Sequence, residues 1–170
     1  AHSVRIPIIL YNVPSRTGVD IPVSVYQQLS EVPNIVGVKD ATGNMSYTVE
    51  VLRRTKDLDF AVYSGEDKLT AAFGAIGGKG VISVGANVYP KAFEEMAQAA
   101  MHNDLQKAQT IMCDMEHFIT LMFNDVNPIP VKEALNILGW NMGNPRLPLT
   151  KLSDNGIKQM ENALKNFGLK

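Results

Sequence analysis

Four short runs of apolar residues lie in the first half of the chain, and a segment with helical periodicity separates each from the next. The runs cover residues 6–11, 35–38, 60–63 and 81–84. Each is continuous rather than alternating, which is typical of strands buried on both faces of a parallel sheet. The intervening segments, about 22–30, 45–56 and 67–76, predict helices, with Pro22 in a first helical turn. The order β-α-β-α-β-α-β predicts an α/β fold.

After residue 84 the pattern predicts helices only. They cover about 90–102, 105–123, 131–138 and 153–167. The apolar residues of 105–123 fall on one helical face, Pro128 and Pro130 introduce the next helix, and Gly168 is a suitable residue to follow the last one. Residues 139–148 form a polar loop, under which we expect Trp140 to pack.

Composition excludes several classes of function. Hydrophobic residues make up 45% and charged residues 19%, with a net charge of -1, so nothing favours nucleic acid or an anionic membrane as a partner. A single cysteine, Cys113, cannot form an intrachain disulfide, which fits a cytoplasmic protein. His2, His102 and His117 do not cluster with it at metal-ligand spacing, so we expect no metal site.

Four βα units amount to half of an eightfold barrel, which needs roughly 250 residues. Four parallel strands alone would leave two unpaired edges. The chain also starts at Ala1 and enters a strand pattern almost at once, as we expect of a fragment. Two alternatives follow from the pattern: a small open α/β domain with covered edges, or a sheet that another piece completes.

Candidate chemistry follows the first two strands. Tyr-Asn-Val-Pro-Ser-Arg-Thr-Gly (11–18) offers Tyr11, a phenol able to relay protons, and Arg16, a planar group able to grip a carboxylate. Gly-Val-Lys-Asp-Ala-Thr-Gly (37–43) places Lys39 at the end of an apolar strand, where a neutral amine could attack a ketone. Each residue alone also fits a structural role, as a capping tyrosine, a solvated arginine or a rim lysine paired with Asp40.

A glycine-rich segment, Gly-Gly-Lys-Gly-Val-Ile-Ser-Val-Gly-Ala-Asn (77–87), precedes the fourth predicted strand. It is not a P-loop, because Lys79 is followed by Gly80 and the order is helix to strand. We interpret the glycines as a tight turn that brings the backbone of residues 80–84 close to a ligand.

These strings, with Tyr-Ser-Gly-Glu-Asp at 63–67, resemble the dihydrodipicolinate synthase family of pyruvate-dependent class I aldolases. The resemblance extends over the whole chain. It implies a (β/α)8 TIM barrel, of which this chain supplies about the last four βα units and a C-terminal helical extension. Residues 1–88 would be the second half of the barrel, and residues 89–170 the last barrel helix and the helical domain.

The resemblance also implies roles for five residues. Lys39 matches the lysine that forms a Schiff base with pyruvate, and Tyr11 the tyrosine that relays protons. Arg16 matches the arginine that binds the carboxylate of the second substrate, aspartate semialdehyde. Ile82 matches a position whose backbone carbonyl lies near the lysine, and Gly65 lines the same pocket.

The implied function is the synthase of lysine and diaminopimelate biosynthesis, which needs no cofactor. The family's Gly-Thr-Thr-Gly-Glu loop is absent from these 170 residues, so we expect the chain alone to be incomplete for catalysis. It would be completed by an N-terminal half or act as a homo-oligomer, with a homotetramer typical of the family. Two alternatives stay open: a related lyase such as N-acetylneuraminate lyase, against which Arg16 argues, and an inactive half-barrel.

Overall fold

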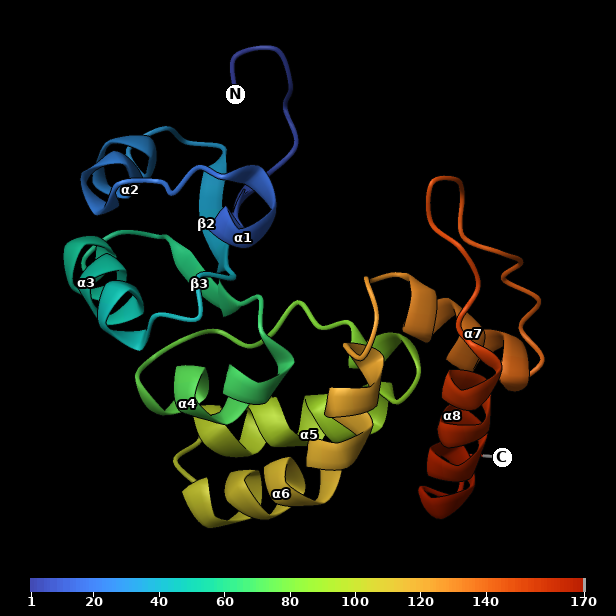
Figure 1. Cartoon of the computed structure of the whole chain (residues 1–170). Helices are drawn as coiled ribbons and strands as arrows, with labels where there is room; N and C mark the ends of the chain where they lie inside the picture. Colours follow the sequence, from blue (N-terminus) through green and yellow to red (C-terminus); the bar gives the residue numbers. More distant parts are fainter. Residues whose placement is uncertain (170) are drawn as a thin grey trace.

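The computed structural model describes residues 1–169 and shows a small sheet with helices beside and below it (Figure 1). The strands are β1 (Ile8–Asn12), β2 (Ile35–Asp40) and β3 (Ala61–Ser64). The α-helices are α1 (Pro14–Thr17), α2 (Val23–Leu29), α3 (Met45–Thr55), α4 (Thr70–Ala75), α5 (Pro90–Met101), α6 (Leu105–Met122), α7 (Ile129–Ile137) and α8 (Asp154–Asn166). Two short 3-10 turns, η1 (Asp67–Leu69) and η2 (Gly85–Asn87), complete the described elements.

The three strands run parallel in the order β1-β2-β3, and the sheet is not closed within residues 1–169. Tyr11 pairs with Lys39, and Lys39 with Tyr63. Residues paired across neighbouring parallel strands point to the same face, so these three form one row. The next residue along each strand forms a row of buried polar side chains on the opposite face: Asn12, Asp40 and Ser64.

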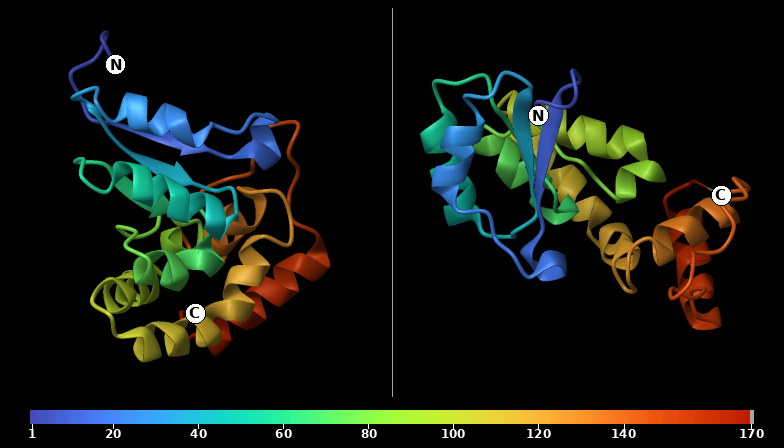
Figure 2. Two further views of the ribbon diagram at one scale, coloured as in Figure 1. Left: turned by 90° about the vertical axis from the view of Figure 1, so that its left-hand side faces the viewer. Right: turned by 90° about the horizontal axis from the view of Figure 1, so that it is seen from above.

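Helices α2 and α3 cover the face that carries the buried polar row, as Figure 2 shows from above. The core between them is apolar and includes Tyr26, Val38, Val51 and Val62. The opposite face is open, because Ile9 is 43% exposed and Tyr11 50% exposed. The sheet therefore has one face that anchors the fold and one that is accessible.

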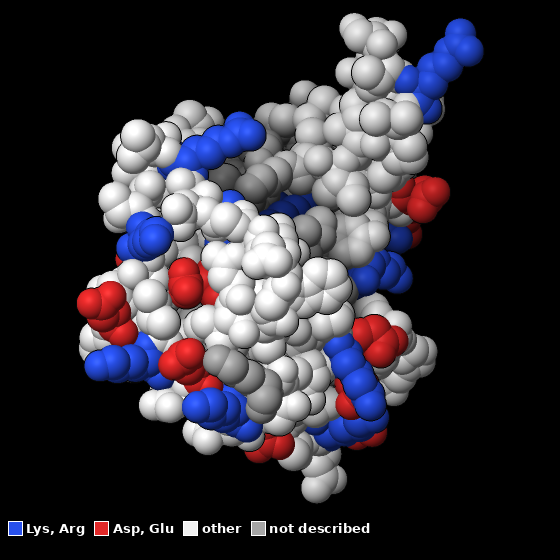
Figure 3. All heavy atoms as spheres, turned by 90° about the vertical axis from the view of Figure 1, so that its right-hand side faces the viewer, with Lys and Arg blue, Asp and Glu red and all other residues white. Residues whose placement is uncertain are grey.

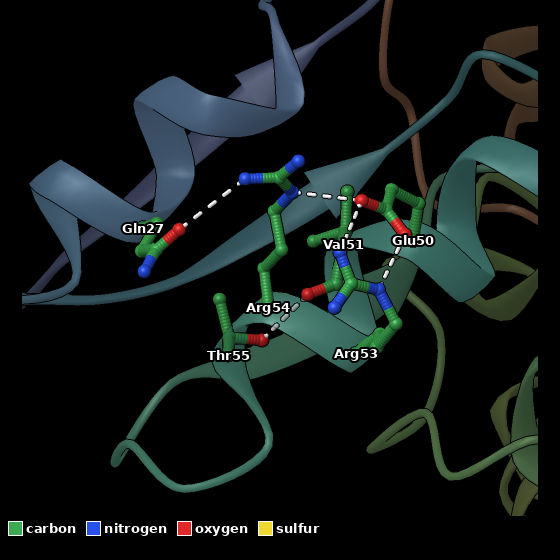
Figure 4. A network of polar contacts seen from close by, with 6 residues as sticks. All are labelled: Gln27, Glu50, Val51, Arg53, Arg54 and Thr55. Atoms are coloured by element: carbon green, nitrogen blue, oxygen red, sulfur yellow. Dashed lines mark hydrogen bonds and ion pairs between the residues drawn. The ribbon is translucent and has the colours of Figure 1, made fainter.

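The covering helices are joined at their outer surface by a polar network (Figure 4). Glu50 on α3 accepts hydrogen bonds from Arg53 Nε at 2.7 Å and Arg54 Nε at 2.8 Å. Arg54 also donates to Gln27 on α2, over 3.4 Å. The arginine fork thus bridges two helices that share the apolar core below it.

A second apolar core lies among the later helices. It joins α5, α6, α7 and α8 through side chains such as Phe93, Phe118, Met122 and Leu164. Phe118 meets Phe167 edge to face, with ring centroids 5.5 Å apart. On the face shown in Figure 3, positive and negative side chains are interspersed over the lower part. None of the helices described is long and apolar enough to cross a membrane.

The prediction of a fourth strand at residues 81–84 is wrong. Val81 forms only an isolated bridge with Ser64, after which the chain turns into η2. A strand needs a ladder partner, and β3 ends at Ser64, while no other described strand lies beside Val81. Residues 1–169 therefore contain three strands paired in the sheet and one segment that forms an isolated bridge.

The remaining expected elements agree with the structure to within about two residues, with three differences, whereas α1 and η2 were not expected. Residues 67–76 form η1 followed by α4 rather than one helix. Pro22 precedes α2 as its N-cap instead of lying in the first turn. Trp140 is 70% exposed, so the expectation that it packs under its loop is wrong.

Candidate active site

Lys39 lies at the carboxyl end of β2 on the open face of the sheet. Its Nζ sits 4.4 Å from the centroid of the Tyr11 ring, which comes from the end of β1. A cation over an aromatic face is attracted by the ring quadrupole, and the attraction reaches about 0.5–1 kcal/mol at exposed sites. The sheet register thus brings together the two residues for which catalytic roles are predicted.

The residue after Lys39 fixes the end of its strand. Asp40 is buried on the opposite face and accepts hydrogen bonds from Thr42 N at 2.9 Å and from the Thr48 hydroxyl at 2.7 Å. Because Thr48 belongs to α3, the carboxylate ties the strand end to the covering helix. Alternation along the strand then directs Lys39 toward the open face.

Gly65 also lies at this edge of the sheet. Its N–H donates to the Asp40 carbonyl over 2.7 Å. A Cβ at this position would lie 2.7 Å from the Ala41 Cβ, so the close approach of the two strand ends requires glycine. The structure thus shows a backbone contact of Gly65 with the residue after Lys39. The role of Gly65 in lining a pocket stays a prediction.

A buried network holds the loop that follows Tyr11. The Asn12 amide donates to Asp20 at 2.7 Å and to the Tyr47 hydroxyl at 2.9 Å, and its oxygen accepts from Ile21 N at 3.4 Å. The Tyr47 hydroxyl in turn donates to the Ile21 carbonyl and lies 3.1 Å from the Tyr26 hydroxyl. The two ends of the loop that carries α1 and Arg16 are thereby joined.

The tyrosines of this network are kept neutral. Burial raises the pKa of Tyr26 far above its usual range, and the hydrogen bond with Tyr47 raises it further. Burial also raises the pKa of Tyr47, although hydrogen bonds with Tyr26 and Asn12 lower it. Both phenols therefore serve as hydrogen-bonding groups rather than as proton donors to a substrate at neutral pH.

The segment that carries Ile82 runs beside the end of β3. Ile82 N donates to the Ser64 carbonyl over 2.9 Å, and the Ile82 residue is 38% exposed. Further on, Val84 N and Gly85 N donate to the carboxylate of Asp67, at 3.2 Å and 2.8 Å. Asp67 is fully buried, so this turn is fixed from below by a single side chain.

Arg16 lies on α1 and lines a recess whose lining includes neither Lys39 nor Tyr11. The recess has a volume of about 640 Å³ and is also lined by residues 123–127, between α6 and α7. Arg16 is exposed there, next to Asn124 and Asn127. The structure thus places Arg16 opposite the helical part of the chain, whereas Lys39 and Tyr11 lie on the sheet.

Sequence reasoning missed the buried polar residues that support the site. Asp67 and Asn12 each stand at or just after the end of a strand, and such a position was the available signal. No cluster of three or more His, Cys, Asp or Glu able to hold a metal ion occurs in the part of the chain that the structure describes.

An open parallel sheet that carries a lysine and a tyrosine at its carboxyl ends defines an α/β protein with a strand-end site. The family model of the dihydrodipicolinate synthetase family matches residues 1–167. The 4-hydroxy-tetrahydrodipicolinate synthase of Methanosarcina mazei is 44% identical over 169 residues, which cover 99% of this chain and 58% of that protein.

Solved structures of dihydrodipicolinate synthases have a similar fold over the length of this chain. The chloride-inhibited dihydrodipicolinate synthase of Acinetobacter baumannii, complexed with pyruvate, superposes with a TM-score of 0.93 at 40% identity, covering 99% of this chain and 58% of that one. The synthase of Cyanidioschyzon merolae with lysine bound gives 0.91 at 36% identity, covering 96% and 55%.

The chain belongs to the dihydrodipicolinate synthetase family, whose members are lyases of lysine biosynthesis. Its fold is part of the family's TIM barrel, with a parallel sheet that is not closed. The chain spans about 58% of the length of the curated relatives it matches.

Proposed function

We propose that this chain is the C-terminal part of a 4-hydroxy-tetrahydrodipicolinate synthase in which Lys39 forms a Schiff base with pyruvate. The observation that carries the proposal is the Lys39 amine held 4.4 Å from the Tyr11 ring on the open face of the sheet. The sequence identity to such synthases and the pyruvate bound by the Acinetobacter baumannii relative support it.

The chemistry begins when the neutral Lys39 amine attacks the ketone carbon of pyruvate and water leaves, which gives an imine. The imine draws electrons from the methyl group, which loses a proton and becomes an enamine carbon. This carbon attacks the aldehyde of aspartate semialdehyde, and cyclisation frees the lysine. Tyr11, which is 50% exposed beside Lys39, would relay the protons. No organic cofactor is needed, because the imine itself accepts the electrons.

Arg16 would bind the carboxylate of aspartate semialdehyde with its planar guanidinium. The loop that carries Arg16 is held at both ends by Asn12. A sugar-acid substrate, as in N-acetylneuraminate lyase, would leave this second cation without a carboxylate partner.

The division of the chain at residues 88 and 89 is part of the proposal. One core packs β1, β2 and β3 against α2 and α3, and the other joins the helices from α5 onward. In the completed barrel, residues 80–84 would take the place of the last strand, with a neighbour on the side of Val81 away from Ser64. An N-terminal segment or further copies of the chain would supply the missing part of the barrel.

The proposal is tested by condensation assays with pyruvate and either aspartate semialdehyde or a sugar aldehyde. We expect turnover with aspartate semialdehyde only, once the missing part of the barrel is supplied, and its loss in Lys39→Ala. Lys79→Ala is the matched control, since Lys79 is exposed and lies before the bridged segment. Normal turnover by Lys39→Ala would refute the role of the lysine, while preference for the sugar aldehyde would favour the rival lyase.

A further inference from the structure

The backbone around Ile82 is held by two different devices. Up to Ile82 it follows the end of β3, because Ser64 N donates to the Gly80 carbonyl and Ile82 N to the Ser64 carbonyl, both over 2.9 Å. Beyond Ile82 this pairing stops, and the chain turns into η2. The direction of the turn is therefore set by whatever holds the residues that follow.

Asp67 provides that second attachment. Its two carboxylate oxygens accept separately from Val84 N, at 3.2 Å, and from Gly85 N, at 2.8 Å. A Cβ on Gly85 would lie 2.5 Å from the Phe93 ring and 3.2 Å from the Asp67 carboxylate. Glycine is thus required for the turn to approach the carboxylate this closely.

Opposing influences act on the pKa of Asp67, which on balance is raised above its usual value. Burial raises the pKa of Asp67, while hydrogen bonds from Gly85 N, the Ser83 hydroxyl and Val84 N, together with the positive charge of Lys39, lower it. Asp67 is therefore within electrostatic reach of the predicted nucleophile, although its side chain lies below the turn. The Asp67 carboxylate therefore holds the turn directly, by hydrogen bonds from Val84 N and Gly85 N, and is influenced by the charge of Lys39.

Resting on the proposed function, we propose that Asp67 is a positioning residue for Schiff-base formation. Its buried carboxylate fixes the turn of residues 83–85 and thereby sets the position of the Ile82 carbonyl relative to the Lys39 amine. A carbonyl so placed accepts an N–H hydrogen bond from the amine and directs the nitrogen lone pair at the ketone. A misplacement of about 1 Å in such an arrangement can lower a rate about 10²-fold.

The test measures adduct formation by the whole chain at several pyruvate concentrations, with borohydride to reduce the imine. In Asp67→Asn we expect the saturating rate to fall at least tenfold, and the half-saturating pyruvate concentration to stay within about twofold. Asp104→Asn is the matched control, because the Asp104 carboxylate also accepts a backbone N–H, that of Lys107, but on the exposed start of α6. We expect it to react at the wild-type rate.

A second readout follows the turn itself. Amide hydrogen exchange at Val84 and Gly85 should be at least tenfold faster in Asp67→Asn than in wild type, with overall unfolding by urea used to correct for global stability. A folded Asp67→Asn protein that forms adduct at the wild-type saturating rate, or that keeps the wild-type exchange at both amides, overturns the proposal.

A milder variant covers the case in which Asp67→Asn does not fold. Ser83→Ala removes the hydroxyl that hydrogen-bonds the carboxylate and that also accepts from Ala86 N at 2.9 Å, and it keeps the bonds from Val84 N and Gly85 N. The variant should lower the saturating rate by about two- to fivefold, which is a smaller loss than that expected for Asp67→Asn. Wild type and Asp104→Asn should both react faster than Ser83→Ala. An unchanged rate in Ser83→Ala counts against the proposal. If wild type and Asp104→Asn both give no adduct, the proposed function fails, and the inference fails with it.

Discussion

Lys39 lies between two tyrosines on the open face of the sheet, and the two differ in their contact with the amine and in their exposure. Tyr11 presents its ring to the amine, with the centroid 4.4 Å from Nζ, and is half exposed. Tyr63 is paired with Lys39 in the strand register and is less accessible. The ring of Tyr11 contacts the amine, and the proton transfer that we propose belongs to its hydroxyl.

Tyr11→Phe separates these two functions. The ring contact survives, so we expect imine formation with pyruvate at a rate within about threefold of wild type. The exchange of pyruvate methyl protons with deuterated water should fall by about 10²-fold, because the proton relay is lost. Proton NMR measures this exchange, and Tyr63→Phe is the control from the same row. Wild-type exchange in Tyr11→Phe would exclude the relay.

The placement of Lys39 and Tyr11 at strand ends could be predicted from the sequence. The buried hydrogen bonds that hold the neighbouring backbone could not. The continuous apolar runs placed Lys39 and Tyr11 at the ends of strands, and the register places them side by side. Nothing in the local sequence shows that Asp67 would reach the N–H groups of Val84 and Gly85, seventeen and eighteen positions away. Such contacts depend on tertiary packing, which local patterns do not contain.

At the scale of elements, helices were predictable because their apolar period repeats over several turns. The helix from Leu105 to Met122 differs from its expected end by one residue. The segment 81–84 has an equally apolar pattern, yet it forms no ladder strand, because a strand depends on a neighbour that local sequence cannot provide. The covered and open faces of the sheet were likewise not distinguishable in continuous apolar runs.

The loop between β1 and α2 should depend on the Tyr47 hydroxyl. Tyr47→Phe leaves the Ile21 carbonyl and the Asn12 amide each without one partner, which should lower the free energy of unfolding by about 1–3 kcal/mol. Urea unfolding measures the change. Tyr89→Phe is the matched control, since Tyr89 is half-buried and no hydrogen bond of its hydroxyl is among the contacts described for residues 1–169. Equal losses in both variants would contradict the role of the network.

The Glu50 network on α3 should make stability depend on acid pH. Hydrogen bonds from Arg53 and Arg54 lower the pKa of Glu50 from 4.5 to about 2. Because the pKa of Glu50 is lower in the folded state, its interactions with the arginines stabilise the fold above pH 4.5. This stabilisation is lost as the pH falls toward 2. We expect a small effect that salt reduces, because the groups are exposed.

The measurement is the urea midpoint at several pH values across this range. Wild type should lose more stability on acidification than Glu50→Gln. Glu95→Gln provides the control, because the contact of Glu95 with Lys91 is long, at 3.9 Å. A wild-type and a Glu50→Gln curve that run parallel down to pH 2 would contradict the assigned pKa.

At the scale of the whole molecule, the open face of the sheet is the feature that connects fold and function. The three strands carry their buried polar residues toward α2 and α3, and Tyr11, Lys39 and Tyr63 away from them. The chain spans about 58% of the length of its relatives, and Lys39 lies on this open face. Whether the Lys39 amine of this chain forms an imine with pyruvate is the central question.

Intact mass after incubation with pyruvate and borohydride answers it most directly. Reduction converts the imine into a stable secondary amine, and the chain gains the mass of pyruvic acid less one oxygen atom. The account predicts one such adduct, which peptide mapping places on Lys39 and which Lys39→Ala abolishes. A folded chain that gains no adduct, or gains it on another lysine such as Lys79, would contradict the assignment of Lys39.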